Sequence, residues 1–274
     1  MKDNREKIIA ILIIATLIFS LFTIYAYSAQ RKEIRVSAKA AALYNPETGT
    51  FIYKKNENAH LSMASTTKIM TAIIAIENSD LDKVITVDNR AIGVEGSSIY
   101  LKNGEEISIK SLLYALMLRS ANDAAAALAY EISGSIEDFS ILMNDKVREL
   151  GLCDTNFENP HGLDSPSHYT SAHDLAVISA NAISNPTFKE ICSARKVKIE
   201  SSLETRILIN HNKLLSLYEG CIGIKTGYTK KSGRSLVSAA EKDSQTLICV
   251  TINAPDDWND HKRLFDFGFS ELLI

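Results

Sequence analysis

The sequence lacks the signals that mark metal, nucleotide and nucleic-acid proteins. Its net charge of −3 leaves no excess of basic residues for binding nucleic acid. The six histidines are scattered, and no pair has the HExxH spacing of a zinc site. Neither a GxxxxGK phosphate loop nor a GxSxG nucleophile elbow occurs. We therefore expect no nucleic-acid partner, no metal and no cofactor.

Cysteine is sparse and widely spaced, at positions 153, 192, 221 and 249. No two cysteines form a CxxC pair, which excludes the usual metal and redox motifs. An exported chain can pair its cysteines in disulfides, whereas free cysteine is among the residues most often buried. We favour four small core residues and leave disulfide pairing open.

One long apolar run is present, from Ile8 to Tyr27, after three basic residues. Its length suits a membrane span, which takes about 20 apolar residues. Ala26-Tyr27-Ser28, however, offers a small-x-small cleavage site. Residues 1–29 are therefore predicted to be a signal peptide or an N-terminal membrane anchor. In either case the rest of the chain is exported, to the outer face of the cytoplasmic membrane or beyond it.

Residues 36–274 are predicted to form one globular domain, since 46% hydrophobic and 23% charged residues suit a large core. Segments typical of strands lie towards both ends, and segments typical of helices lie between them. The predicted strands are 40–44, 50–53, 84–87, 99–101, 197–199, 207–209, 222–226, 235–240 and 246–252. The predicted helices are 109–118, 123–132, 136–150, 171–182 and one from about residue 259. This order predicts an α+β fold with one antiparallel sheet, built from both ends and covered by helices.

A serine and a lysine open one apolar segment, Ala64-Ser65-Thr66-Thr67-Lys68. The following residues, 69–76, are almost uniformly apolar, which predicts a helix buried within the domain. Buried polar groups need partners, so a functional site is the natural reason for them here. At spacing i, i+3, Ser65 and Lys68 lie on one helix face. The helix N-terminus favours negative charge on the serine oxygen, and a desolvated lysine loses its proton easily, so we predict a serine nucleophile activated by lysine.

The SxxK pattern alone is weak evidence, because a second copy stands at residues 193–196. Ser-Ala-Asn also occurs twice, at residues 120–122 and 179–181, and Lys-Thr-Gly occurs once, at residues 225–227. The second Ser-Ala-Asn falls inside a helical pattern, whereas the first lies where two predicted helices join and side chains can point into a cleft. Ser65 alone is as well explained as a helix cap. Only the first SxxK, the first Ser-Ala-Asn and Lys-Thr-Gly give three motifs in order.

SxxK, SxN and KTG in this order resemble the motifs of penicillin-binding proteins and serine β-lactamases. More narrowly, the chain resembles the low-molecular-weight D-alanyl-D-alanine carboxypeptidases, with added likeness at Asn-Pro-His-Gly-Leu-Asp (159–164), at 168–176 and at 223–229. The resemblance covers about residues 36–274. It implies a β-lactamase/transpeptidase-like fold, in which a five-stranded antiparallel sheet is flanked by helices and joined to a helical lobe. It also implies a serine-type D-Ala-D-Ala carboxypeptidase that trims peptidoglycan stem peptides, limits their cross-linking and binds β-lactam antibiotics covalently.

The resemblance assigns chemical roles to the motif residues. Ser65 would attack the carbonyl between two D-alanines and form an acyl-enzyme, with Lys68 accepting its proton. The backbone N–H groups of Ser65 and Tyr228 would form an oxyanion hole for the charge that develops in the transition state. Ser120 and Lys225 would pass a proton to the leaving amine.

The same resemblance implies a substrate-binding set. Asn122 would hold the amide of the substrate. Lys225 and Thr226 would bind its terminal carboxylate through charge-assisted hydrogen bonds. Gly227 would let the strand backbone approach the ligand closely, with Tyr228 next to it.

Several features depart from the family pattern or receive no role. In some relatives a basic residue before the last helix helps to bind the carboxylate, whereas residues 256–259 here read Asp-Asp-Trp-Asn. His often follows KTG, and Tyr228 stands there instead. The all-β second domain and C-terminal anchor of many relatives are not expected, because the last predicted helix lies near residue 274. His161 and His173 are expected to be structural.

Two other functions stay open. A class A serine β-lactamase shares the motifs but needs a glutamate that activates water, and its usual ExxLN signature is absent. Glu158 lies in a comparable region, but within Asn-Phe-Glu-Asn-Pro, which is the carboxypeptidase pattern. A non-catalytic penicillin-binding sensor would tolerate loss of Lys68 or Lys225, yet both are present. The preference for terminal D-alanine over cross-links also stays open.

Overall fold

The computed structural model describes residues 12–20 and 34–272. The chain divides into two compact units, residues 1–35 and residues 36–274. In the first unit residues 12–20 are helical and exposed. Among the described residues, no helix combines the length and the apolar character that crossing a membrane requires. Both ends of the apolar run from Ile8 to Tyr27 lie outside the described residues, so the signal or anchor assignment stays a prediction.

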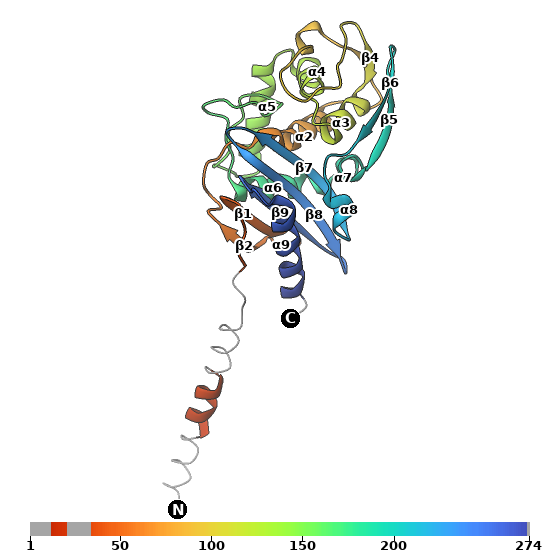
Figure 1. Ribbon diagram of the computed structural model, residues 1–274. Coiled ribbons are helices and arrows are strands. Elements are labelled where there is room, and N and C mark those ends of the chain that lie inside the picture. The colour runs from red at the N-terminus through yellow and green to blue at the C-terminus, as the bar shows by residue number, and fades with distance from the viewer. Residues whose placement is uncertain (1–11, 21–33, 273–274) are drawn as a thin grey trace, which may run out of the picture. The chain divides into compact units, whose positions relative to one another are not determined.

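A five-stranded antiparallel sheet is the main sheet of the second unit (Figure 1). Its strands are β1 (Ala40–Asn45), β2 (Thr50–Lys55), β7 (Cys221–Thr229), β8 (Gly233–Lys242) and β9 (Gln245–Ile252). Their order is β2-β1-β9-β8-β7, so the first strand of the domain pairs with the last. The predicted sheet built from both ends of the domain is confirmed. It leaves β7, which carries Lys-Thr-Gly, at the edge of the sheet.

Helices cover both faces of this sheet. The C-terminal helix α9 (Asp257–Glu271) packs on β8 and β9, and α6 (Ala172–Ser184) packs on β1 and β9 from the opposite face (Figure 1). The helix α6 also contacts α2 (Lys68–Asn78), whose residues from Lys68 to Ala75 are all buried. The predicted buried helix is thereby confirmed. Ser65, however, stands one turn earlier, in the 3-10 turn η1 (Ala64–Thr67) that precedes α2.

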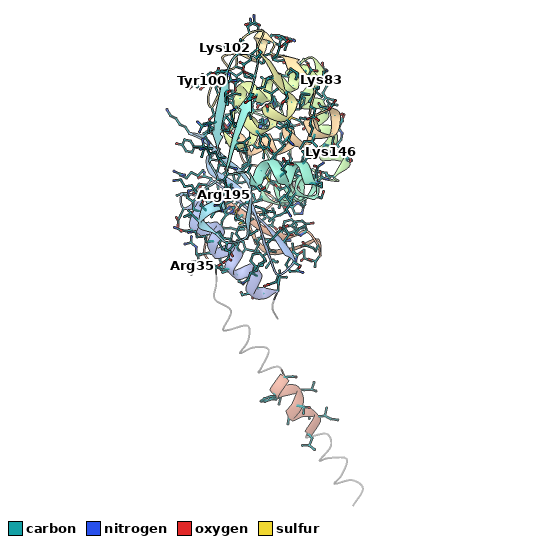
Figure 2. All side chains as sticks on the ribbon, turned by 90° about the vertical axis from the view of Figure 1, so that its right-hand side faces the viewer. Arg35, Lys83, Tyr100, Lys102, Lys146 and Arg195 are labelled. Atoms are coloured by element: carbon teal, nitrogen blue, oxygen red, sulfur yellow. The ribbon has the colours of Figure 1, made fainter. Side chains whose placement is uncertain are left out.

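A helical lobe lies on the far side of α2 from the sheet (Figure 1). Its helices α3 (Ile109–Leu118), α4 (Asn122–Ser133) and α5 (Ile136–Glu149) pack in sequence on one another, and α2 contacts all three. One buried apolar cluster runs from the sheet through α2 into this lobe. The outer end of the lobe carries Tyr100 and Lys102, far from the sheet (Figure 2). The order of helices expected from the sequence is confirmed.

Two small strand pairs flank the lobe. The first joins β3 (Val84–Thr86) with β4 (Glu106–Ser108), and the second is the hairpin of β5 (Lys196–Glu200) and β6 (Thr205–Ile209). The predicted strand at residues 99–101 is wrong. Its backbone N–H groups are satisfied by a side chain, since the carboxylate of Asp123 accepts from Ile99 at 3.2 Å and from Leu101 at 3.0 Å. That segment is therefore a fixed loop.

Three short helical elements were not predicted, namely η2 (Asn89–Ala91), α7 (Pro186–Ser193) and α8 (Leu214–Leu217). The pair Asn185-Pro186 was interpreted only as the end of the preceding helix. It also starts the next one, because the Asn185 side chain accepts hydrogen bonds from the N–H groups of Thr187 and Phe188 while Pro186 takes the first helical position.

Candidate active site

Ser65 lies in the short turn η1, half-buried, at the N-terminal end of α2. Its side chain is not a helix cap, because no side-chain cap hydrogen bond is present at either η1 or α2. The preceding residue, Ala64, has a φ of 48°, in the left-handed region that alanine adopts only at a cost. The turn therefore presents the Ser65 hydroxyl in a conformation that its surroundings, not its local sequence, impose.

Lys68 is completely buried and meets three oxygen atoms. Its Nζ donates to Asn122 Oδ1 at 2.6 Å and to the His161 carbonyl at 2.5 Å, and it lies 3.1 Å from Ser65 Oγ. Burial, and then the nearby Lys225 cation, hold the pKa of Lys68 well below its usual value, while Asp123 opposes this shift. A neutral lysine within hydrogen-bond distance of a hydroxyl has the geometry and the proton affinity of a general base. The predicted pairing of Ser65 with Lys68 on one face is confirmed.

The first Ser-Ala-Asn motif lies at the turn between α3 and α4, as predicted. Ser120 has a φ of 60°, is buried and lines the same cavity as Ser65. Asn122 is also buried, and both ends of its amide are hydrogen-bonded: Oδ1 accepts from Lys68, and Nδ2 donates to the carbonyl of Glu95. Asn122 therefore holds Lys68 in place and ties it to the loop before α3.

Lys-Thr-Gly lies within β7 rather than at its end, on the open edge of the sheet. Lys225 is buried and donates to the Thr226 carbonyl at 2.9 Å. Burial lowers its pKa to about 7. The next residues alternate in exposure along the strand, with Gly227 buried and Tyr228 exposed.

Gly227 brings the strand against the turn that carries Ser65. A Cβ atom at this position would lie 3.1 Å from the Met63 carbonyl oxygen and 3.2 Å from the Ser65 nitrogen, tighter than most real contacts. The absence of a side chain thus lets the backbone of β7 lie beside the N–H of Ser65. This close approach is to the turn of Ser65, and the predicted approach of Gly227 to a ligand stays a prediction.

A loop after α5 packs against the turn η1 that carries Ser65, and the sequence analysis did not identify this contact. Gly162, with a φ of 87°, contacts Ala64 so closely that an added Cβ would lie 2.0 Å from the Ala64 carbonyl oxygen. The His161 carbonyl accepts from Lys68, while burial, followed by the Lys68 cation, lowers the pKa of the His161 ring to about 3. His161 therefore acts through its backbone with a neutral ring. The Asn-Pro-His-Gly motif was the available signal.

These residues surround a cavity of about 310 Å³. Its lining comprises Ser65, Ser97, Ser120, His211, Thr226, Gly227, Tyr228, Arg234, Asp257 and Trp258. Two charged residues that the sequence analysis did not select, Arg234 and Asp257, lie in this wall with Arg234 Nη1 3.7 Å from Asp257 Oδ2. The lining does not include Lys68, Asn122 or Lys225. These three residues lie behind lining residues such as Ser65, Ser120 and Thr226.

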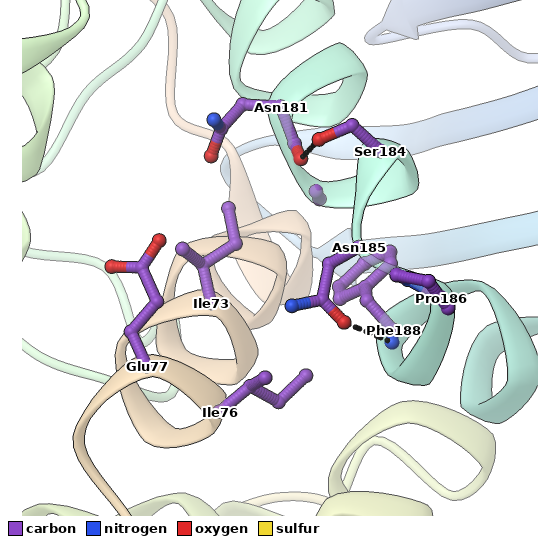
Figure 3. Close-up of a pocket in the computed structure, with 9 residues that line it drawn as sticks. Ile73, Ile76, Glu77, Asn181, Ser184, Asn185, Pro186 and Phe188 are labelled. Carbon is purple, nitrogen blue, oxygen red and sulfur yellow. Dashed lines mark hydrogen bonds between the residues drawn. The ribbon is translucent and has the colours of Figure 1, made fainter.

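The second copies of Ser-Ala-Asn (residues 179–181) and SxxK (residues 193–196) lie outside this cavity. Asn181 of the second Ser-Ala-Asn lines a separate cavity of about 250 Å³, together with Ile73 and Glu77 on the side of α2 that faces α6 and α7 (Figure 3). In the second SxxK, Ser193 donates to the Glu190 carbonyl and Lys196 is exposed. Neither second copy contributes a residue to the cavity that Ser65 lines.

The four cysteines are free, with Cys192 and Cys249 buried and Cys153 exposed. Burial raises the pKa of Cys221 to about 11, so its thiol is protonated and unreactive at neutral pH. The expectation of core cysteines holds for two of the four and is wrong for Cys153. Within residues 12–20 and 34–272, no group of three or more metal-ligating side chains forms a candidate metal site.

Comparison with known proteins points in the same direction as this geometry. The family model described as D-alanyl-D-alanine carboxypeptidase matches residues 26–256. The chain is 35% identical to D-alanyl-D-alanine carboxypeptidase DacF of Bacillus subtilis over 87% of its own length and 64% of that protein's, so it spans less than two thirds of that relative. It is 32% identical to DacB2 of Mycobacterium tuberculosis, over 82% of this chain and 79% of the relative.

Solved structures of similar fold come from the same group of enzymes. The crystal structure of the Streptomyces K15 DD-transpeptidase matches with a TM-score of 0.84 and 30% identity, over 87% of this chain and 99% of that one. The transpeptidase-like fold expected from the motifs is thereby confirmed. Because the family model covers most of the chain and the three motifs converge on one cavity, this chain belongs to the D-alanyl-D-alanine carboxypeptidase family.

Proposed function

We propose that this protein is a serine-type D-Ala-D-Ala carboxypeptidase that trims the terminal D-alanine from peptidoglycan stem peptides and thereby limits their cross-linking. The observation that carries the proposal is the buried Lys68 Nζ, 3.1 Å from Ser65 Oγ, with its pKa well below the usual value. Names and structures of relatives support the same reaction. The proposed ligands are stem peptides ending in D-Ala-D-Ala and, as covalent inhibitors, β-lactam antibiotics.

In the proposed acylation, Ser65 Oγ bonds to the carbonyl carbon of the penultimate D-alanine as Lys68 takes the hydroxyl proton. The N–H groups of Ser65 and Tyr228 stabilise the oxyanion, for which the close approach of Gly227 is the supporting geometry. The C–N bond then breaks, and the terminal D-alanine leaves as an amine after receiving a proton through Ser120 and Lys225. Water hydrolyses the ester and regenerates the Ser65 hydroxyl.

On the substrate side, Thr226 and Lys225 are proposed to bind the terminal carboxylate. Asn122 is proposed to hold the substrate amide in addition to Lys68. Its Nδ2 donates one N–H to the Glu95 carbonyl, and the second N–H of that nitrogen would serve the substrate.

The β-lactamase alternative lacks a suitable carboxylate. Glu158 is exposed, and its carboxylate accepts from the N–H of Ser167 at 3.0 Å, in the loop rather than at the cavity. Among the described residues that line the cavity, the only carboxylate is Asp257, which faces Arg234. No glutamate is therefore placed to activate water for a bulky penicilloyl ester. We expect a long-lived penicillin adduct.

The first test is Ser65→Ala. Loss of the nucleophile should abolish covalent labelling by fluorescent penicillin, because a missing serine nucleophile typically costs about 10⁶-fold in rate. Ser193→Ala removes the serine of the other SxxK copy and should label like the wild type. Labelling that survives Ser65→Ala would exclude this serine as the acylated residue.

The second test separates the three functions. Intact-mass spectrometry after a short penicillin pulse and removal of free drug should show an adduct lasting minutes or longer, since a barrier about 1.4 kcal/mol higher already slows a step tenfold. Release of D-alanine from a D-Ala-D-Ala peptide should proceed catalytically in the absence of penicillin. Loss of the adduct within seconds with drug turnover would indicate a β-lactamase. Stable acylation without peptide turnover would indicate a sensor.

We also propose that residues 36–274 form the catalytic domain and that residues 1–29 export it, as a cleaved signal or as an anchor. The enzyme would then act on the outer face of the cytoplasmic membrane or in the cell wall. Protease added to intact, wall-stripped cells should digest the domain. Full protection would contradict this location.

A further inference from the structure

We propose that Arg234, on β8, binds the terminal carboxylate of the substrate and makes the enzyme selective for a free C-terminus. This inference rests on the proposed function, whose carboxylate subsite it extends. Residues 256–259, where some relatives carry a basic residue, contribute Asp257 and Trp258 to the cavity instead. The positive charge at the cavity therefore comes from another strand.

The charge inventory of the cavity points to Arg234. It is the only lining residue in the described chain that carries a permanent positive charge, since a guanidinium stays protonated in proteins. The other basic lining residue, His211, has its pKa lowered by burial and then by Lys225, which favours a neutral ring. Lys225 lies behind the lining, and with a pKa of about 7 it is uncharged in about half of the molecules at neutral pH. Arg234, beside the Asp257 carboxylate, is therefore the permanent cation in the lining that the carboxylate of a ligand can reach.

The strand register places Arg234 beside the residues expected to hold the substrate. Arg234 pairs directly with Tyr228 across β7 and β8, and Thr226 lies two residues before Tyr228. Directly opposed residues and residues two apart share one face of a sheet. All three line the cavity, so the Thr226 hydroxyl and the Arg234 guanidinium converge on one volume. A fork of N–H donors and a hydroxyl together match the two oxygens of a carboxylate.

Asp257 holds the guanidinium without using its donors. The pair is separated by 3.7 Å, which is longer than a hydrogen bond, and the Asp257 side chain is almost completely buried. Within residues 34–272 the guanidinium of Arg234 donates no hydrogen bond, and its side chain is 54% exposed. The N–H groups are therefore available to a ligand, while the charge of Asp257 keeps the side chain at the cavity.

The test compares carboxylate ligands with neutral ones in the full-length protein. Benzylpenicillin has a free carboxylate near the attacked carbonyl, and its methyl ester is the matched neutral ligand. Arg234→Ala should slow Ser65 acylation by benzylpenicillin about 10- to 100-fold, as expected for lost charged hydrogen bonds, and change the rate with the ester less than twofold. Arg234→Lys should recover part of the loss, because it restores the charge but not the fork.

The matched control is Lys231→Ala, which removes a positive charge from an exposed residue of the neighbouring turn outside the cavity. It should leave the acid-to-ester rate ratio within twofold of the wild type. An unchanged ratio in Arg234→Ala, or equal losses with acid and ester, would overturn the proposal. The same holds for a wild type without preference for the acid.

The failure of the proposed function gives a different result. A wild type that is acylated by penicillin but releases no D-alanine from a D-Ala-D-Ala peptide refutes the carboxypeptidase assignment. The acid-to-ester ratio still decides the role of Arg234 in that case. Peptide turnover with an unchanged ratio refutes only the role of Arg234, and a wild type that reacts with neither ligand refutes both.

Discussion

The cavity has a helical wall, which carries Ser65, Lys68 and Ser120, and a strand wall on β7 and β8, which carries Thr226, Tyr228 and Arg234. The two walls hold their polar groups in opposite ways. On the helical wall, Lys68 is fully buried and contacts three oxygen atoms from three separate segments. On the strand wall, Tyr228 is 67% exposed, and Arg234 is held by one long ion pair. The difference fits the roles proposed for Lys68 and Arg234: the proposed base is fixed before substrate arrives, and the proposed carboxylate-binding guanidinium keeps its donors free.

This fixation has a physical basis. A base must hold its lone pair at a set distance from the hydroxyl in every turnover, and small errors in position are costly in rate. A recognition group must exchange water for ligand, so internal partners would compete with the substrate. Breaking each wall in turn should therefore give effects of different size.

The largest effect should come from removing the base. Lys68→Met keeps the approximate volume but leaves Ser65 without a proton acceptor, so acylation by penicillin should fall about 10²- to 10⁴-fold. Stopped-flow labelling gives the rate. Lys196→Met, in the other SxxK copy, should leave it unchanged. A loss below about tenfold in Lys68→Met would contradict the role of Lys68.

The second largest effect on the acylation rate should come from Gly227, where the two walls are in contact. In Gly227→Ala the new Cβ needs room at 3.1 Å from the Met63 carbonyl and 3.2 Å from the Ser65 nitrogen, so strand and turn must separate by a few tenths of an ångström. We expect about a 10- to 100-fold slower acylation, since the oxyanion donors are displaced.

Gly268→Ala is the matched control for that change. Its Cβ would meet the side chains of Leu43, at 2.5 Å, and Leu247, at 2.7 Å, within the core rather than at the cavity. It should lower the thermal midpoint and leave the acylation rate of the folded protein unchanged. If Gly227→Ala behaved in the same way, the close approach of β7 would serve packing alone.

The motif residues of both walls were predicted from sequence, whereas Arg234 on the strand wall was not. Ser65 and Lys68 are three residues apart, at the junction of η1 and α2, so local geometry brings them together. The importance of Arg234 depends on the register between β7 and β8, which the turn at residues 230–232 sets and which motif matching does not examine. The His161 carbonyl was missed for a related reason, because a backbone atom leaves no side-chain signature. The false strand at 99–101 arose from apolar residues whose N–H partners lie in a distant carboxylate.

The pH profile of acylation separates the two lysines, one from each wall. The proposed acylation requires a neutral Lys68, so the rate should rise with pH through the lowered pKa of that lysine. Lys225 is proposed to act as a cation, and with a pKa of about 7 it loses its charge as the pH rises, so the rate should fall above about pH 7. The two lysines interact, so the limbs of the bell-shaped profile describe the pair. A rate that keeps rising from pH 7 to pH 9 would contradict the cationic role of Lys225.

The smallest effect should come from the most exposed residue of the strand wall. The proposed oxyanion donor at Tyr228 is its backbone N–H, and the ring is 67% exposed, so Tyr228→Ala should change acylation less than about threefold. Tyr228→Phe separates the hydroxyl from the ring and should match the wild type. The same stopped-flow labelling gives both rates. A loss above about tenfold in the alanine variant alone would show that the ring contacts the ligand. The strand wall would then recognise substrate through this aromatic side chain as well as through Arg234.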